Sequence, residues 1–216
     1  MIGFTRSPFF KPLLILTLVL HFDCLSAADG LKNAKLCFKV GAINSTIYNS
    51  RGINEFPKNR ANITFGSFFY LPLNDRFVFQ PELLFARRGF SANGTIAGND
   101  YTLKRSSDYL DVPLLVGYKP ESFMTLFIGP QFSRLLHQTD RFSNDPVPLT
   151  REYQFARDRY RKHIFCITGG IDININDVLL VMRVGWDMED NRWDDNDQTP
   201  KYKNVWYQLA VGIVVF

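Results

Sequence analysis

The chain has 216 residues and a composition typical of a folded protein, apart from an aromatic content of 15% that includes 20 phenylalanines. Its length allows one domain or at most two, and a formal net charge of +4 gives no reason to expect a nucleic-acid-binding protein. Aromatic residues favour strands over helices. We therefore expect a β-rich protein with no nucleic-acid partner.

The N-terminal segment has the features of a secretory signal peptide. Arg6 and Lys11 form a basic flank, residues 13–20 are an apolar run, and small residues suited to cleavage follow. The apolar run is too short to span a bilayer as a helix. We predict a cleaved signal peptide at residues 1–28 and a mature barrel domain at residues 29–216. Cleavage would remove two basic residues and one acidic residue, which lowers the net charge from +4 to +3.

After residue 28, strand-like segments of about ten residues alternate with three short connections and four long polar ones. The short connections are residues 72–76, 119–122 and 174–177, and the long ones are residues 45–60, 89–101, 137–162 and 187–204. Alternating short turns and long loops, with both ends of the chain on the short-turn side, are typical of small outer-membrane barrels. The pattern predicts an all-β fold, namely an eight-stranded antiparallel transmembrane β-barrel.

Two-residue alternation indicates which side chains face the interior. In the third segment Gln80 and Glu82 share a face that the phenylalanines avoid, because successive strand residues point to opposite sides. Lys39, Asp111 and Arg183 take equivalent positions in other segments. The interior of an eight-stranded barrel is filled by side chains, and a mutually satisfied set of charges is tolerated there. We predict a lumen polar network of Lys39, Gln80, Glu82, Asp111 and Arg183.

The alternation is weaker in two segments, residues 61–71 and 205–216, where apolar residues occupy both faces. The registers of the second and eighth strands are therefore left open. Aromatic residues also fall near segment ends, where the interfacial girdles of a membrane barrel lie. The predicted girdle consists of Tyr118, Trp186, Trp206, Tyr207 and Phe216.

Two cysteines remain after the predicted signal peptide, Cys37 and Cys166. They fall on the predicted first and sixth strands, which are not neighbours in the barrel. A disulfide requires Cα atoms within about 7 Å. We therefore expect two free thiols on the lumen side.

A soluble β-barrel or sandwich, with apolar residues inside, is the alternative fold. The recurring mid-segment charges count against it, because a soluble core would exclude them and its exterior would be polar. Pro81 and Pro113 count mildly in its favour, since each removes a ladder donor and predicts a bulge or local break.

Several short motifs resemble those of a known family in both order and spacing. They are FQPELLF at residues 79–85, Arg88-Gly89, YLDVPLL at residues 109–115, Lys39-Val40-Gly41, Gly129-Pro130-Gln131 and Arg183 in the penultimate strand. From Leu36 to Phe216 the chain resembles the PorT-like outer-membrane β-barrel family of Bacteroidetes. The resemblance implies an eight-stranded barrel in the outer membrane of a Gram-negative bacterium, inserted by the barrel-assembly machinery.

The namesake of that family takes part in type IX protein secretion, so secretion-machinery subunits are candidate partners. We expect a non-enzymatic surface, binding or assembly role, with no cofactor, metal or catalytic residues. Three alternatives remain: a component of type IX secretion, an outer-membrane lipid-acting enzyme, and a gated conduit for small ions. The enzyme hypothesis depends on His137 and His163, which lie beside Asp140 and Asp158, and no further residue completes a catalytic arrangement.

Two predicted loops carry opposite charge. Residues 134–163 contain seven basic and four acidic residues, and residues 187–203 contain three basic and six acidic residues, which gives about +3 and −3. These signs fit a latch between the loops, separate contacts, or two solvated loops with no assigned partner, and the last of these is the interpretation we favour. In the second case the basic loop would contact outer-membrane lipid and lipopolysaccharide, and the acidic loop would contact divalent cations.

Overall fold

The computed structural model describes residues 34–51, 58–96, 99–143, 149–152, 161–192 and 201–215. Its strands are β1 (Lys35–Arg51), β2 (Lys58–Pro72), β3 (Phe77–Ile96), β4 (Asn99–Glu121), β5 (Met124–Ser143), β6 (Leu149–Glu152), β7 (His163–Ile175), β8 (Val178–Asp187) and β9 (Lys201–Val214). The predicted signal peptide and Phe216 lie outside the described residues. A search of the described residues for a helix long and apolar enough to cross a membrane found none.

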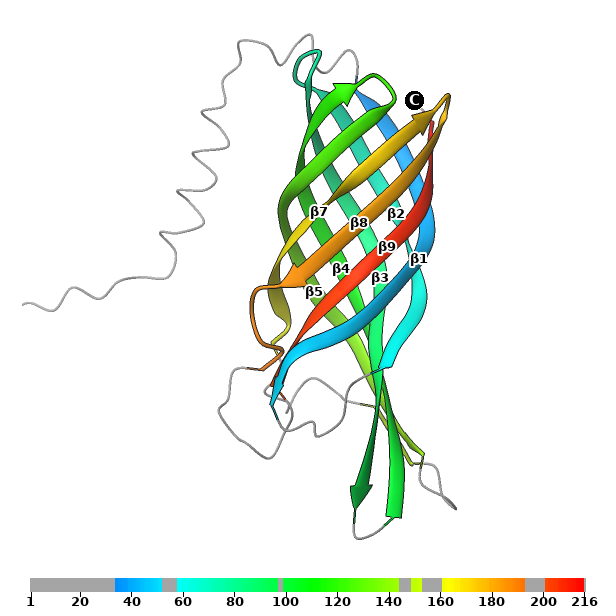
Figure 1. Cartoon of the computed structure of the whole chain (residues 1–216), viewed down its shortest axis with the longest axis vertical. Coiled ribbons are helices and arrows are strands. Elements are labelled where there is room, and N and C mark those ends of the chain that lie inside the picture. Colours follow the sequence, from blue (N-terminus) through cyan, green and yellow to red (C-terminus); the bar gives the residue numbers. More distant parts are fainter. Residues whose placement is uncertain are drawn as a thin grey trace, which may run out of the picture.

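Eight strands close into one antiparallel barrel (Figure 1). β1 pairs with β2 on one side and with β9 on the other, and β4 pairs with β5. The remaining strand, β6, has four residues and adds to the far end of β5. The predicted eight-stranded antiparallel barrel is therefore confirmed.

The short turns β2–β3, β4–β5 and β7–β8 lie at one end of the barrel, and the C terminus lies at the same end (Figure 1). In the β7–β8 turn, Asn176 has a φ of 58°. Asparagine adopts this left-handed conformation more readily than most residues, which suits a tight connection. The other end of the barrel is called the long-loop end below.

The prediction of a loop at residues 89–101 is wrong. β3 continues to Ile96 and β4 begins at Asn99, and their ladder runs without a break from Leu84↔Asp111 to Ile96↔Asn99. Figure 1 shows this hairpin continuing past the rest of the barrel wall. The predicted loop at residues 137–162 similarly contains the end of β5 and all of β6. The outer face of these segments is polar, as at Ser91, Lys104 and Arg141, so composition alone resembled that of a loop, although Phe90 and Ala92 are buried on the inner face.

The prolines interrupt the ladders as predicted. Pairing of β3 with β4 passes from Pro81↔Leu114 directly to Leu84↔Asp111, and pairing of β4 with β5 passes from Pro113↔Gln131 to Val116↔Ile128. Proline has no backbone N–H to donate, so the hydrogen bonding lapses next to it.

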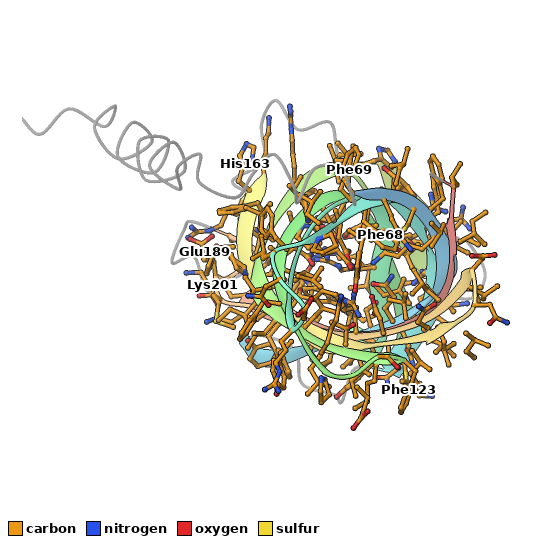
Figure 2. The ribbon with its side chains drawn as sticks, turned by 90° about the horizontal axis from the view of Figure 1, so that it is seen from above. Phe68, Phe69, Phe123, His163, Glu189 and Lys201 are labelled. Atoms are coloured by element: carbon orange, nitrogen blue, oxygen red, sulfur yellow. The ribbon has the colours of Figure 1, made fainter. Side chains whose placement is uncertain are left out.

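The structure determines the two registers that the sequence left open. In β2, Phe68 is 1% exposed and points into the barrel, while Phe69 is 50% exposed on its outer side (Figure 2). In β9, Ala210 faces inward, and Leu209 and Val211 face outward. The exposed apolar side chains form a continuous outer surface that we call the apolar belt. It includes Phe38, Val40, Ile63, Phe65, Phe69, Leu83, Val116, Ile128, Phe132, Leu209, Val211 and Ile213.

The interior near the short-turn end is closed by packed apolar side chains. One cluster contains Cys37, Phe68, Leu179, Val181 and Ala210. A second contains Val78, Leu115 and Phe127. This end of the lumen is therefore filled by side chains, as expected for a barrel of eight strands.

Candidate functional site

Four buried charges form a cluster between this apolar end and the middle of the barrel. Lys39 Nζ donates to Glu82 Oε2 at 2.7 Å, and both terminal nitrogens of Arg183 donate to Asp172. Arg183 Nη2 lies 3.5 Å from Glu82 Oε1, which joins the two pairs. Gln80 Nε2 donates to Glu82 Oε1 at 2.7 Å. Two cations face two carboxylates, so the cluster is electrically balanced although it is buried.

Arg88 forms the centre of a second cluster, further toward the long-loop end. It is fully buried, it donates to Asp111, and its Nη1 lies 3.8 Å from Asp187 Oδ1. The guanidinium carbon is 3.8 Å from the centroid of the Trp206 ring and 4.7 Å from that of Tyr109. Arginine stacks well on aromatic faces, so the rings replace part of its lost hydration. This cluster holds one cation against two carboxylates.

The buried cysteines agree with the prediction of lumen-side thiols, since Cys37 and Cys166 are both free. Cys166 Sγ donates to Asp187 Oδ1 at 3.2 Å and lies 3.4 Å from Ser133 Oγ. The Cys166 thiol therefore serves as a polar contact within the Arg88 cluster.

A third cluster lies where β4 and β5 leave the barrel. Arg105 binds Asp140 through two hydrogen bonds, Nε to Oδ1 at 2.7 Å and Nη2 to Oδ2 at 2.5 Å. Arg105 Nη1 also donates to the Tyr202 hydroxyl at 3.0 Å. The bidentate pair ties β4 to β5 and connects them to β9 at the long-loop end.

The five predicted network residues thus all lie in the interior, four in the first cluster and Asp111 in the second. The sequence reasoning missed Arg88, Arg105, Asp140, Asp172 and Asp187 as network members. The two-residue alternation of the sequence does indicate two of them. Alternation carried forward from Glu82 reaches Arg88, and carried backward from Asp111 it reaches Arg105. Both arginines lie within the segments that were expected to be strands, and they were missed because only charges at the middle of a segment were taken as lumen residues.

The assignment of Trp206 to the aromatic girdle is wrong. Trp206 is 2% exposed and points into the lumen, on the same face of β9 as Gln208 and Ala210. Gly185 lies opposite it on β8, and a Cβ built on that glycine would stand 2.1 Å from the indole ring. The absence of a side chain at Gly185 makes room for the indole, which then stacks on Arg88.

The other girdle residues differ in position. Tyr118 is exposed at the short-turn end, where its ring lies 5.6 Å from that of Phe77. Trp186 and Tyr207 are exposed on the outer wall toward the long-loop end. Phe216 is outside the described residues. Their membership of a membrane girdle stays a prediction.

Replacing Gly185 with alanine is expected to destabilise the barrel by about 1–3 kcal/mol, because the new methyl group displaces the Trp206 indole from Arg88. Urea unfolding in lipid vesicles, followed by tryptophan fluorescence, measures the change. Gly169→Ala is the control, since a Cβ there would meet its nearest atom at 3.3 Å. Equal stability of the two variants would contradict the packing argument.

At the long-loop end one ion pair connects the two segments of opposite charge. Arg161 Nη1 lies 2.7 Å from Glu189 Oε1, and the Arg161 backbone N–H donates to the Asn191 carbonyl at 2.8 Å. This contact is the kind that the latch hypothesis predicts. Among the described residues no group of three metal-ligating side chains is present, and residues 193–200, with Asp194, Asp195 and Asp197, lie outside them.

The carboxylate suggested as the catalytic partner of His137 is engaged elsewhere. His137 Nε2 lies 3.0 Å from Thr139 Oγ1, while Asp140 is buried against Arg105. His163 is exposed on the outer wall, and Asp158 is outside the described residues. Asp140 is therefore committed to Arg105, and the pairing of His163 with Asp158 stays a prediction.

The outer face of the extended β3–β4–β5 sheet carries a line of basic side chains. Arg87 and Asp108 form an exposed pair, Nε to Oδ1 at 2.5 Å, on the side of the apolar belt that faces the long-loop end. Further from the belt, a row of cross-strand partners runs over four strands. It consists of Lys58 (β2), Ser91 (β3), Lys104 (β4) and Arg141 (β5), and we call it the basic row.

Comparison with known proteins supports the fold. A family model for the outer membrane protein beta-barrel domain matches residues 30–213. The crystal structure of Ail, the attachment invasion locus protein of Yersinia pestis, is 11% identical with a TM-score of 0.50, over 84% of this chain and 99% of Ail. Ail in complex with the heparin analogue sucrose octasulfate gives a TM-score of 0.51, with 11% identity over 84% of this chain and 99% of Ail.

Neisserial surface protein A (NspA) is 8% identical with a TM-score of 0.38, over 84% of this chain and 97% of NspA. A search of curated proteins found no match. Identities this low show a shared fold alone, and the resemblance to PorT-like proteins of Bacteroidetes stays a prediction. Because the family model covers most of the chain and the structure is a closed barrel with an apolar belt, this protein belongs to the outer membrane protein beta-barrel domain family of the Gram-negative outer membrane.

Proposed function

We propose that this protein is a non-enzymatic surface protein that binds polyanionic glycans through the basic row. The observation that carries the proposal is the pairing of Lys104 with Arg141, two exposed cations directly opposite each other on β4 and β5. Like charges in this position repel and destabilise a sheet. A bound anion would relieve that repulsion, so the arrangement favours a ligand with several negative groups.

Neighbouring side chains add to the positive charge around Lys104 and Arg141. Lys58 is exposed in the same row, and within the described residues none of Lys58, Lys104 and Arg141 forms an ion pair with a carboxylate. Arg60 Nη1 donates to Ser106 Oγ at 2.7 Å, which holds its cation over the same sheet. Asp140 is no counter-ion for the row, because it points to the opposite face and binds Arg105.

The position of the basic row favours a binding role over the two alternatives, an ion conduit through the lumen and a lipid-acting enzyme. The lumen charges are engaged with one another, and packed side chains fill the barrel near the short turns. The extended sheet, by contrast, presents its basic face outside the apolar belt. Sulfated polysaccharides and the phosphorylated core of lipopolysaccharide share the polyanionic chemistry that such a face would recognise.

Isothermal titration with sucrose octasulfate, on the full-length barrel in detergent, tests the proposal. We expect the double variant Lys104→Gln/Arg141→Gln to bind at least roughly tenfold more weakly, since two charge-assisted contacts are lost. The control Lys35→Gln/Arg76→Gln removes the same charge at exposed sites near the short-turn end and should bind like the wild type. A parallel titration with phosphorylated lipopolysaccharide core distinguishes the two ligand sources.

Equal binding by both double variants would overturn the proposal. A role in type IX secretion is a second candidate, supported only by the PorT-like motifs in the sequence. Copurification of the tagged barrel from its native membrane tests it, since secretion-machinery subunits should be recovered together with the barrel.

A further inference from the structure

A groove of about 430 Å³ lies on the outer wall of the barrel, over β4, β5 and β7. Its apolar part is formed by Leu110 and Val112 of β4, Phe132 of β5 and Phe165 of β7. Phe132 and Phe165 are direct cross-strand partners, and their ring centroids are 5.6 Å apart in an edge-to-face arrangement. The volume falls within the range of roughly 300–1,000 Å³ that is typical of small-molecule sites.

Two basic side chains close the end of the groove that lies toward the long loops. Arg134 and His163 are direct partners on β5 and β7, two residues beyond Phe132 and Phe165 on the same outer face. Both are exposed, and no ion pair is formed by either within the described residues. The groove therefore has an apolar floor within the belt and basic groups at its polar edge.

Glu189 borders the groove but does not neutralise these groups. Its Oε1 lies 2.7 Å from Arg161 Nη1, and its Oε2 accepts a hydrogen bond from the Phe165 backbone N–H at 3.1 Å. Both carboxylate oxygens of Glu189 are thus bound to groups other than Arg134 and His163. Figure 2 shows Glu189 and His163 on the same side of the barrel.

We infer that this groove is a binding site for one phosphorylated, acylated glycolipid of the outer leaflet, the lipid A part of lipopolysaccharide. The phosphate is held by Arg134 and His163, and an acyl chain lies against Phe132 and Phe165. Arginine provides paired donors that match phosphate oxygens. An amphiphile with one anionic head and an apolar tail matches both the polarity of the groove and its place at the belt edge.

This site differs from the basic row, which lies on the sheet beyond the belt and would bind glycan from water. The two proposals can fail independently. Arg134 and Phe165 are absent from the basic row, and Lys104 and Arg141 are absent from the groove.

Native mass spectrometry of the full-length barrel, titrated with diphosphoryl lipid A in mild detergent, tests the inference. We expect the wild type to retain one lipid A molecule, and Arg134→Gln to reduce its apparent affinity about tenfold through the lost charge-assisted contact. Phe165→Ala should weaken retention several-fold, because part of the apolar floor is lost. Arg76→Gln, an exposed arginine at the short-turn end, is the control and should behave like the wild type.

Dephosphorylated lipid A is the second probe, and the wild type should retain it at least as weakly as Arg134→Gln retains the diphosphoryl form, because the contacts of both Arg134 and His163 are lost. Retention that is insensitive to Arg134→Gln, or equal for the two lipids, would overturn the inference. All substituted residues are exposed, so a urea unfolding curve like that of the wild type confirms that each barrel is folded.

Discussion

Replacing Arg88 with methionine is expected to lower the unfolding free energy of the barrel by about 3–5 kcal/mol. Arg88 is fully buried and is the cation that faces both Asp111 and Asp187. Its removal leaves two carboxylates close together in the lumen with no cation between them. It also removes the group on which the Trp206 indole stacks.

The neighbouring residue provides a control of the same type. Arg87 forms an ion pair with Asp108 on the outer face, where its side chain is 46% exposed. Arg87→Met should therefore change the unfolding free energy by less than about 1 kcal/mol. Reversible urea unfolding in lipid vesicles measures both variants under identical conditions.

A second substitution tests whether unpaired buried charge causes the loss of stability in Arg88→Met. Adding Asp111→Asn to Arg88→Met removes one of the two unpaired charges, so the double variant should be more stable than Arg88→Met alone. If both arginine variants lose the same stability, or if the double variant recovers nothing, buried charge is not what makes Arg88 important.

Glu82→Gln is the second substitution with a large expected effect, a loss of about 3–5 kcal/mol. Glu82 accepts hydrogen bonds from Lys39 and Gln80 and lies 3.5 Å from Arg183. Without its charge, two buried cations share the single carboxylate of Asp172. The change in shape is small, so the loss reports on charge balance rather than on packing.

The double variant Lys39→Met/Glu82→Gln restores one cation to one carboxylate, Arg183 to Asp172. We expect it to recover at least half of the stability lost by Glu82→Gln, because exchanging a buried ion pair for neutral groups is often nearly neutral. Glu121→Gln, an exposed carboxylate at the short-turn end, is the control and should lie within about 0.5 kcal/mol of the wild type. Urea unfolding of the wild type and the three variants in vesicles of one lipid composition measures these differences in unfolding free energy. A double variant less stable than Glu82→Gln would refute the charge-balance account.

The two-residue alternation was sufficient to predict the barrel and the direction of most side chains. Gln80 and Glu82 face inward in the structure while Leu83 faces outward, as the third segment indicated. Alternation is a local property of an extended chain, so it can be recognised in one strand without knowing which strands pair with it. The alternation of short turns with long polar stretches was also read from the order of residues alone, although the stretch at residues 89–101 is a strand hairpin and not a long loop.

The ends of the strands were misjudged because polarity was taken as evidence of a loop. Ser91 and Lys104 are polar and yet belong to a regular ladder, since the outer face of that sheet lies beyond the apolar belt. A strand whose outer face meets water needs no apolar residues on that face, so its composition resembles that of a loop. Only the pairing of β3 with β4 shows that the ladder continues.

The sequence by itself therefore determined that this protein is a barrel with an apolar outer wall and charges within, because each of these features follows from the order of residues along a single strand. The tertiary structure alone decided which charges meet. Lys39 and Glu82 are 43 positions apart in the chain, and Arg183 and Glu82 are 101 apart. It also decided that Trp206 stacks on Arg88 inside the lumen. Such contacts depend on the register and tilt of non-consecutive strands, which closure of the barrel fixes and no local pattern encodes.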